Sequence, residues 1–480
     1  MTLWFDVTDL SLWGGGHLTG IQRTSVNVLS ELMAARQDIQ LFVYYPSEKV
    51  LRKINVSSLP TIIREGVIST RGLDTKTFGD HPHGTAIATS NVFSVARESI
   101  TIRCRNLRSS LRRQPRKWVG DEMMDATKEF LRSSLNLLRK MRRKLFGESR
   151  TAESPTPVRV PPESILFKRG DVCLSLSATW GLPHYGDVIT ANTSANGAKC
   201  INMIYDLIPT LFPQWVLPGH SQMITLWARR QIENADVVLT ISKFQKEEIS
   251  RYILADKLPD RTIEVIHLGD NPKLVAATAA DASLPLPRYV PKRKFVICVS
   301  TLDVRKNHRL LYNVWCRLAD ELGPDCPQLL LIGAPHLHVS DLLYQIHNDR
   351  LVNRLIIHLH DATDEELAWY YRHCQFTVYP SMYEGWGLPI SESLSLGKYC
   401  IAGNKTSLPE AGGDLVDYFD PLDFVGCYKL VYKAVTDPDY VEQYERRIRA
   451  SYVPHTWTMA AAHISEIVDR IADSGQREAV

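Results

Sequence analysis

The sequence predicts an α/β protein with two doubly wound parallel sheets, each in a domain of its own. Short, fully apolar runs of strand length recur along the chain, and helical patterns separate them. The alternation stops at a stretch rich in proline and alanine near residue 280 and then starts again. The length of 480 residues also exceeds what one hydrophobic core usually organises.

The first domain is expected to open with a strand–helix–strand unit. Residues 3–10 (LWFDVTDL) are predicted to form a strand and residues 11–22 a glycine-rich loop. A helical pattern over 23–36 then leads to a strand over 39–45. This order indicates a parallel sheet. Further strands are predicted at 171–177, 200–209, 236–242 and 262–268, and Ser242 is expected to cap a helix over 243–253.

The second domain repeats this alternation after the proline-rich stretch. The predicted boundaries are an N-terminal Rossmann-like domain at 1–275, a linker at 276–290, a C-terminal Rossmann-like domain at 291–452 and a C-terminal helix at 453–480 that packs back on the first domain. Its strands are predicted at 294–302, 327–335, 354–360, 375–381 and 398–404.

A basic insertion at about 95–165 interrupts the first domain. Residues 97–150 contain 16 Lys and Arg residues against 6 Asp and Glu residues, whereas the whole chain has a net charge of only +3. Residues 129–146 combine an apolar helical stripe with five cations, a pattern typical of a helix that lies on an anionic membrane surface. A solvated insertion is an equally open interpretation, and nucleic-acid binding ranks below both because few aromatic rings accompany the charge.

The composition is that of an ordinary globular protein, with 44% hydrophobic and 23% charged residues. The nine cysteines form no CxxC pair, so neither a zinc site nor a disulfide framework is expected. The N-terminal residues lack the features of a signal peptide, and no apolar run is long enough to span a bilayer. We therefore expect a cytoplasmic protein that is either soluble or peripheral on the inner face of the plasma membrane.

The glycine loop of the first domain is a candidate for contact with phosphate or sugar oxygens. Gly15 and Gly16 lie between a predicted strand and a predicted helix, where backbone N–H groups are available to a ligand. A tight turn is the simpler interpretation. No GxGxxG dinucleotide fingerprint fits this loop, and Ile and Gln follow Gly20 where a Walker A loop requires Lys and Ser or Thr. NAD enzymes and P-loop ATPases are therefore disfavoured.

Arg305 and Lys306 follow the first strand of the second domain. Ligands of open α/β sheets bind beyond the carboxyl ends of the strands, and two adjacent cations there suit a diphosphate. An exposed loop pair is the alternative for these two residues considered alone.

Glu384 and Glu392 are eight positions apart around the sequence GWGLP. Glu384 is expected in the loop after the strand at 375–381, and Glu392 in the first turn of a helix that Pro389 begins and Gly397 ends. A carboxylate accepts hydrogen bonds from sugar hydroxyls. Two acids beside two cations therefore describe a site for a nucleotide sugar.

These motifs resemble those of retaining glycosyltransferases of family GT4, the glycosyl transferases group 1, which have the GT-B fold. Glu384 and Glu392 match that family's E-x7-E motif, and the likeness is dense over about 290–450. The segments that carry it are STLDVRKNH at 300–308, LLLIGAP at 329–335, DATDEELAWYYRHC at 361–374 and YPSMYEGWGLPISESLSLGKYCIAGNKTSLPEAGG at 379–413.

The resemblance implies two Rossmann-like domains that face each other across a cleft, and sugar transfer without a metal ion or other cofactor. Glu392 would bind ribose and Glu384 the donor sugar, while Arg305 and Lys306 would neutralise the diphosphate. Backbone amides of the stretch from Gly385 through Trp386 and Gly387 to Leu388 would lie against sugar and phosphate. Asp206 is a candidate for orienting the acceptor.

The expected function is transfer of a hexose or deoxyhexose from a GDP-, dTDP- or UDP-sugar to a glycan acceptor. The basic insertion favours a lipid-linked acceptor and contact of residues 97–150 with the anionic inner membrane, in the assembly of lipopolysaccharide, capsule or exopolysaccharide. A sugar-nucleotide epimerase of the same fold and a non-catalytic membrane or nucleic-acid adaptor are the alternatives. Nucleic acid is not expected as a partner, and the DPD sequence at 437–439 is expected to lie in a turn rather than to bind a metal.

Overall fold

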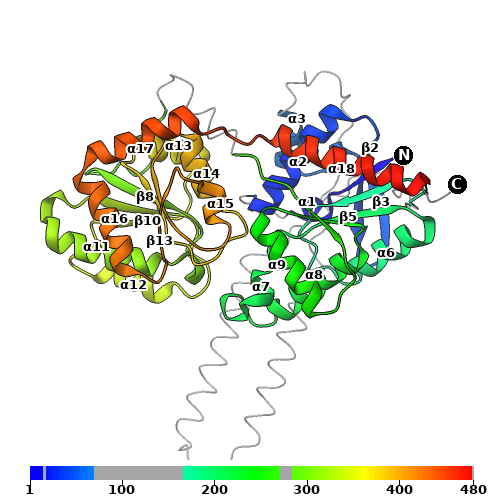
Figure 1. Ribbon diagram of the computed structural model, residues 1–480, viewed down its shortest axis with the longest axis horizontal. Helices are drawn as coiled ribbons and strands as arrows, with labels where there is room; N and C mark the ends of the chain where they lie inside the picture. Colours follow the sequence, from blue (N-terminus) through cyan, green and yellow to red (C-terminus); the bar gives the residue numbers. More distant parts are fainter. Residues whose placement is uncertain (14–17, 70–164, 166, 271–283, 478–480) are drawn as a thin grey trace, which may run out of the picture. The chain divides into compact units, whose positions relative to one another are not determined.

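The computed structural model of the protein describes residues 1–13, 18–69, 165, 167–270 and 284–477. Packing divides the chain into two compact units. The first consists of Met1–Gly79 together with Pro162–Val480, and the second is Asp80–Pro161. The second unit lies outside the described residues, as do residues 95–164 of the predicted insertion and 276–283 of the predicted linker. The first unit contains two separate sheets, which we call sheet A and sheet B (Figure 1).

Sheet A has seven strands among the described residues, in the order β3-β2-β1-β4-β5-β6-β7. Only the β2–β3 pair is antiparallel, and every other neighbouring pair is parallel. The bounds are β1 Leu3–Asp6, β2 Ile39–Tyr45, β3 Val50–Ile54, β4 Val172–Ser175, β5 Lys199–Met203, β6 Val237–Thr240 and β7 Thr262–Val265.

Helices cover both faces of sheet A because alternate strand residues point to opposite sides. Leu174 on β4 packs in a core formed with α2 and α18, whereas its neighbour Cys173 packs in a separate core formed with α6. The helices of this part are α1 Thr8–Ser11, α2 Gly20–Ala35, α3 Thr61–Ser69, α6 Tyr185–Asn196, α7 Ile208–Leu211, α8 His220–Asn234, α9 Lys243–Ala255 and α18 Trp457–Arg477, with 3-10 turns η1 Val56–Ser58 and η4 Pro213–Trp215.

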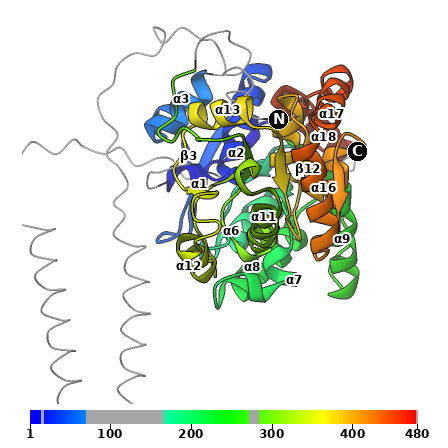
Figure 2. The same cartoon turned by 90° about the vertical axis from the view of Figure 1, so that its left-hand side faces the viewer.

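Sheet B has six parallel strands among the described residues, in the order β10-β9-β8-β11-β12-β13 (Figures 1 and 2). Its strands are β8 Phe295–Val299, β9 Gln328–Ile332, β10 Ile356–Leu359, β11 Thr377–Tyr379, β12 Cys400–Gly403 and β13 Asp417–Phe419. Its helices are α11 His308–Leu322, α12 Ser340–Asn348, α13 Asp364–His373, α14 Leu388–Ser395, α15 Leu408–Gly412, α16 Phe424–Thr436 and α17 Pro438–Ser451, with 3-10 turns η5 Val304–Lys306 and η6 Gly323–Asp325.

Both sheets reverse their direction of growth beside their first strand. In sheet A the chain proceeds from β1 through β2 to β3 and then returns to place β4 on the other side of β1. In sheet B it proceeds from β8 through β9 to β10 and then places β11 on the other side of β8. Such a switch point leaves a crevice at the carboxyl ends of the two central strands, where ligands of doubly wound sheets bind. We therefore expect binding sites beside β1 and β4 and beside β8 and β11.

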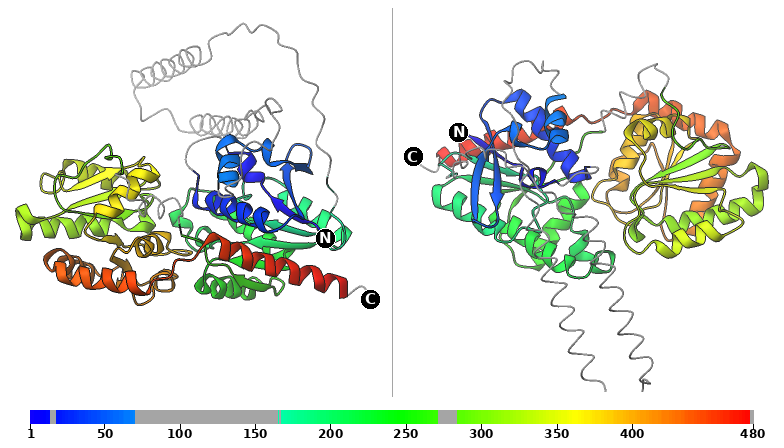
Figure 3. Two further views of the ribbon diagram at one scale, coloured as in Figure 1. Left: turned by 90° about the horizontal axis from the view of Figure 1, so that it is seen from above. Right: turned by 180° about the vertical axis from the view of Figure 1, so that it is seen from behind.

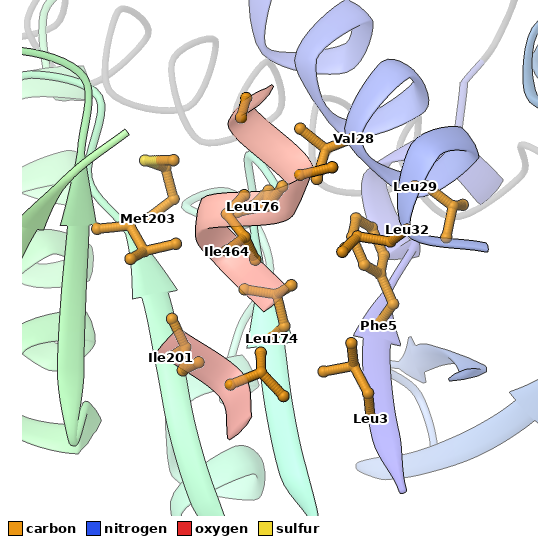
Figure 4. Close-up of a cluster of buried hydrophobic side chains, with 14 of the residues drawn as sticks. Leu3, Phe5, Val28, Leu29, Leu32, Leu174, Leu176, Ile201, Met203 and Ile464 are labelled. Carbon is orange, nitrogen blue, oxygen red and sulfur yellow. The ribbon is translucent and has the colours of Figure 1, made fainter. Parts of the chain in front are cut away.

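The C-terminal helix α18 belongs to the packing of sheet A although it follows sheet B in the chain. Ile464 of α18 lies among Leu29 of α2 and Leu174 and Leu176, which belong to β4 and the residues after it (Figure 4). Helices α18 and α2 run side by side (Figures 1 and 3). The chain therefore crosses twice between the two sheets, once after β7 and once before α18.

The structure corrects the predicted strand at 3–10. The strand ends at Asp6, and helix α1 begins at Thr8 because the Asp6 carboxylate accepts the Thr8 backbone N–H at 2.9 Å and turns the chain. The short strands β3 and β13 were not predicted. The Ser242 cap is confirmed, since its hydroxyl accepts the Gln245 N–H at 3.1 Å. Among the residues that the structure describes, no helix is both long and apolar enough to cross a membrane.

Candidate functional site

Two loops meet at the switch point of sheet B. The first follows β8 and forms the 3-10 turn η5, which carries Arg305 and Lys306. Asp303 caps this turn by accepting the Arg305 N–H at 3.0 Å. The second follows β11 and carries Glu384. The Met382 N–H donates to the Arg305 carbonyl at 2.9 Å, so backbone pairing fixes one loop against the other.

A buried cluster of three charges occupies this point. The Arg305 guanidinium lies 2.7 Å from Glu384 Oε2, and the Lys306 ammonium lies 2.6 Å from Glu384 Oε1. Only 10% of the Glu384 side chain is exposed. The structure thus brings together three of the predicted site residues, and with two cations and one carboxylate the cluster keeps a net positive charge.

Hydroxyl groups complete the hydrogen bonding of Glu384. Oε1 also accepts from the Tyr379 hydroxyl at 2.7 Å and from the Ser381 hydroxyl at 2.5 Å. The Tyr379 oxygen in turn accepts from Lys306 Nζ at 2.7 Å. A carboxylate has about four acceptor positions. Three donors converge on Oε1 and Arg305 contacts Oε2, so in this arrangement Glu384 is the counterion of Arg305 and Lys306.

The pKa values follow from this pairing. Burial acts to raise the pKa of Glu384, but the charges of Arg305 and Lys306 outweigh it and hold the pKa at about 2. Burial is the main influence on Lys306 and lowers its pKa, while Glu384 opposes that shift. Removal of Glu384 would leave both cations without the carboxylate that they share, whereas removal of one cation would leave Glu384 paired with the other.

Glu392 has a different environment from Glu384. It is the fifth residue of α14 and lies in the second turn, which corrects the predicted position in the first turn. Its Oε2 accepts from the buried Tyr371 hydroxyl of α13 at 3.3 Å. Burial raises the pKa of Glu392 to about 7, although the charge of Arg23 and the bond from Tyr371 oppose the shift. Glu392 is therefore only partly ionised at neutral pH.

The glycine turn between the two acids positions the start of α14. Gly387 has φ +125° and precedes the helix, and a Cβ there would lie 2.8 Å from Leu408 Cδ2, so a side chain is excluded. Pro389 lies in the first turn as predicted. The Ser407 hydroxyl donates to the carbonyls of Glu384 at 3.0 Å and Trp386 at 2.7 Å and holds the turn.

Asp206 lies near the charged cluster. It follows β5 and accepts the Ile208 N–H, in the first turn of α7, at 3.0 Å. Burial raises its pKa, and the nearby charge of Arg305 is the largest influence that opposes the shift. A Cβ added at Gly385 would lie 3.4 Å from the Asp206 Cβ, so this loop passes close to Asp206. The indole of Trp386 stacks on His267 with ring centroids 5.1 Å apart. Gly15 and Gly16 lie outside the described residues.

Four side chains that support the site were not predicted from the sequence. Tyr379 and Ser381 bond to Glu384, Tyr371 bonds to Glu392, and the Thr406 hydroxyl accepts the Glu384 N–H at 3.1 Å. Tyr379 and Ser381 flank the strand end before Glu384, and this proximity was the available signal. Asp437 of the DPD sequence caps α17 by accepting the Tyr440 N–H. Pro438 and Asp439 form the first turn of that helix, so the predicted turn is confined to Asp437.

The comparisons with known proteins agree with this region of the chain. The family described as Glycosyl transferases group 1 matches residues 287–419. The chain is 25% identical to the serotype-specific mannosyltransferase WbdA of Escherichia coli over 307 residues, which are 62% of this chain and 37% of that protein. It is 28% identical to the O-antigen chain mannosyltransferase B of Escherichia coli over 260 residues, 54% of this chain and 67% of that protein. The chain thus spans little more than a third of the length of WbdA.

Solved structures share the arrangement of both sheets. Sucrose-phosphate synthase from Thermosynechococcus elongatus matches with a TM-score of 0.55 at 16% identity, over 98% of this chain and 99% of that chain. HepE from Anabaena, in complex with UDP and glucose, matches with a TM-score of 0.54 at 11% identity over the same shares. The predicted GT-B fold and the resemblance to group 1 glycosyltransferases are therefore confirmed.

Proposed function

We propose that this chain, a GT-B protein whose residues 287–419 belong to the glycosyl transferases group 1, is a retaining, metal-independent glycosyltransferase of polysaccharide biosynthesis. It would move a hexose or deoxyhexose from a nucleotide sugar to a glycan acceptor. The observation that carries the proposal is the cluster of Arg305, Lys306 and Glu384 at the switch point of sheet B, within the matched region.

The cluster has the charge that a departing diphosphate requires. Without ligand, Glu384 satisfies both cations. A diphosphate would bring more negative charge than one carboxylate and would take over the hydrogen bonds of Arg305 and Lys306. Glu384 would then be free to accept hydroxyl groups of the donor sugar. The cations would stabilise the charge that develops on the leaving oxygen.

The transfer step balances without a separate base. The bond between the anomeric carbon and the phosphate oxygen breaks, and a bond from that carbon to the acceptor oxygen forms on the same face of the sugar. The acceptor proton passes to the leaving phosphate. Glu392 would bind the ribose hydroxyls, and amides from Gly385 to Leu388 and of Gly15 and Gly16 would contact sugar and phosphate. Asp206 would orient the acceptor.

Mannose is the first sugar to test. Both Escherichia coli relatives are named as mannosyltransferases. This makes GDP-mannose the first donor of a panel that also includes UDP-glucose and dTDP-rhamnose.

A lipid-linked acceptor and a peripheral position on the inner membrane face complete the proposal. The support is the excess of cations in residues 97–150, which lie outside the described residues. Co-sedimentation with vesicles containing phosphatidylglycerol tests this part, with phosphatidylcholine vesicles as the control. Binding to the anionic vesicles should disappear when 97–150 are deleted, and unchanged binding would contradict it.

Incubation with the donor panel and a mannose-terminated oligosaccharide tests the activity itself. We expect release of nucleoside diphosphate coupled to a longer oligosaccharide, and loss of both in Glu384→Ala and in Glu392→Ala. Interconversion of nucleotide sugars without an acceptor would instead identify an epimerase of the same fold. If the wild type acts on no donor, and the variant with both Glu384→Ala and Glu392→Ala still binds the partners of the wild type, the protein would be an adaptor.

A further inference from the structure

The switch point of sheet A holds a carboxylate that the proposed function does not yet use. Helix α1 begins two residues after β1 ends, and this places Asp9 at the carboxyl edge of the sheet. Its Oδ2 accepts the backbone N–H of Ala178, in the segment after β4, at 3.2 Å. Asp9 therefore bridges the two segments that leave β1 and β4, where the topology predicts a ligand crevice.

The neighbouring Asp6 has a complete set of partners. One oxygen accepts from the Thr8 N–H at 2.9 Å and the Thr8 hydroxyl at 2.5 Å. The other accepts from the Ser175 hydroxyl at 2.8 Å and the Tyr185 hydroxyl at 2.5 Å. Asp6 is fully buried. Its role is to tie β1 to β4 and α6, and it has no capacity left for a ligand.

Asp9 differs from Asp6 in one respect that matters for binding. Its Oδ1 is buried and has no hydrogen-bond partner among the described residues, and 8% of the residue remains exposed. Burial, and after it the nearby Asp6 charge, raises the pKa of Asp9 to about 6, although Ala178, Ser177 and Leu10 lie near enough to oppose the shift. The Ser177 hydroxyl itself donates to the Asp6 carbonyl at 3.0 Å and so leaves Oδ1 without a bond. A buried polar atom without a partner needs an explanation in a folded protein, and a ligand that supplies the missing donor is one.

The surroundings of Asp9 select the kind of ligand. Two carboxylates close together repel an anion. No group of three possible metal-binding side chains occurs in the described part of the chain. Tyr205 lies close enough that burial, and after it the Asp9 charge, raises the pKa of its phenol, and its hydroxyl donates to the Leu176 carbonyl at 3.0 Å. Tyr205 packs against the hydrophobic core, so the polar feature left for a ligand is the Asp9 carboxylate, which suits a hydroxyl donor such as that of a sugar.

We propose that Asp9 binds a hydroxyl group of the acceptor pyranoside at the switch point of sheet A. This inference rests on the proposed function and names a residue that holds the acceptor. The hydroxyl would reach Oδ1 from the exposed side of Asp9 and supply the donor that this oxygen lacks, while Oδ2 keeps its bond from Ala178 and holds the side chain at the edge of the sheet.

The test is ligand-observed saturation-transfer NMR with methyl α-D-mannopyranoside on the full chain, with and without GDP. Asp9→Asn keeps the size of the side chain and the acceptor for Ala178. Asp187→Asn is the matched control, because it removes a carboxylate near sheet A whose side chain is 57% exposed. We expect Asp9→Asn to raise the Kd of the mannoside at least tenfold, to leave the Kd of GDP within twofold, and not to lower the unfolding temperature. Asp187→Asn should change none of the three.

The other outcomes distinguish failure of this inference about Asp9 from failure of the proposed glycosyltransferase function. Equal mannoside affinity in the wild type and Asp9→Asn, or no mannoside binding by the wild type, overturns this inference whatever GDP does. A lowered unfolding temperature with parallel loss of GDP and mannoside assigns Asp9 a structural role and also overturns it. A wild type that binds none of GDP, UDP and dTDP contradicts the proposed function, and the effect of Asp9→Asn on the mannoside then still decides the inference.

Discussion

At the carboxyl edge of sheet B two cations share one carboxylate, whereas at the equivalent edge of sheet A two carboxylates lie close together. Both oxygens of Glu384 have partners from β11 and from the loops after β8 and β11. Asp9 keeps one oxygen without a partner among the described residues. The two sheets have the same order of strands around their switch points, so topology alone does not explain the difference.

The difference shows how one arrangement of strands can hold two kinds of site. At the edge of sheet B the two cations are already paired with Glu384, so a ligand must compete with Glu384 for them. The edge of sheet A leaves a hydrogen bond to be made by the ligand. We therefore expect substitution of Glu384 at the first edge to weaken stability and binding together. At the second edge we expect substitution of Asp6 to weaken stability, and substitution of Asp9 to weaken binding without loss of stability.

The largest expected effect is that of Glu384→Gln. The change removes the carboxylate that Arg305 and Lys306 share, and loss of one partner of a buried ion pair typically costs about 3–5 kcal/mol. Urea titration should show this loss in the free energy of unfolding. Glu442→Gln is the control, because its pair with Arg446 is exposed and contributes less than about 0.5 kcal/mol. Equal small losses in both variants would contradict the account of the cluster.

Asp6→Asn should cost less than Glu384→Gln but more than any change at Asp9. An amide nitrogen cannot accept the hydroxyl hydrogens of Ser175 or Tyr185, and a buried donor without a partner costs about 1–3 kcal/mol. The same urea titration measures it. A variant as stable as the wild type would show that Asp6 is not the structural member of the pair.

The next effect concerns pH and Glu392. Because its pKa is raised to about 7, Glu392 is mostly protonated at pH 6 and mostly ionised at pH 8. Ribose hydroxyls donate to the ionised form, so the affinity for GDP should rise by up to about tenfold from pH 6 to pH 8. Calorimetric titration measures the affinity of the wild type and of Glu392→Gln for GDP at both pH values. The pH dependence that remains in Glu392→Gln is the contribution from titration of the nucleotide. An identical pH profile in the variant would exclude this role of Glu392.

The smallest effect is expected at Asp9. Its pKa lies above the usual value of 3.8, so the folded state is penalised where the carboxylate is ionised, above about pH 6. Asp9→Asn should therefore raise the free energy of unfolding by on the order of 1 kcal/mol at pH 8, and the gain should shrink towards pH 4. A variant less stable than the wild type at pH 8 would mean that Asp9 stabilises the fold.

Much of the site of sheet B could be predicted because its chemistry is local in the sequence. Arg305 and Lys306 follow one apolar strand and Glu384 follows another, and residues after parallel strands gather at one edge. Their pairing with one another could not be predicted, since it depends on β8 and β11 being neighbours. The order of strands is a property of the fold that no single segment carries.

The site of sheet A escaped prediction for a different reason. LWFDVTDL was interpreted as one strand because its apolar residues continue past Asp6. The hydrogen bonds from Thr8 to Asp6 end the strand there and begin α1. This local competition between side chain and backbone places Asp9 at the sheet edge instead of within a strand. The apolar pattern of the sequence alone does not reveal this competition.

Calorimetric titration of the full chain with GDP, UDP and dTDP tests the central claim most directly. The claim is that the switch point of sheet B binds the donor diphosphate through Arg305 and Lys306. We predict that at least one nucleotide binds, that Arg305→Ala weakens it at least tenfold, and that Arg309→Ala, a more exposed arginine at the start of α11, leaves it unchanged. Absence of binding by all three nucleotides, or equal affinity in Arg305→Ala and the wild type, would contradict the claim.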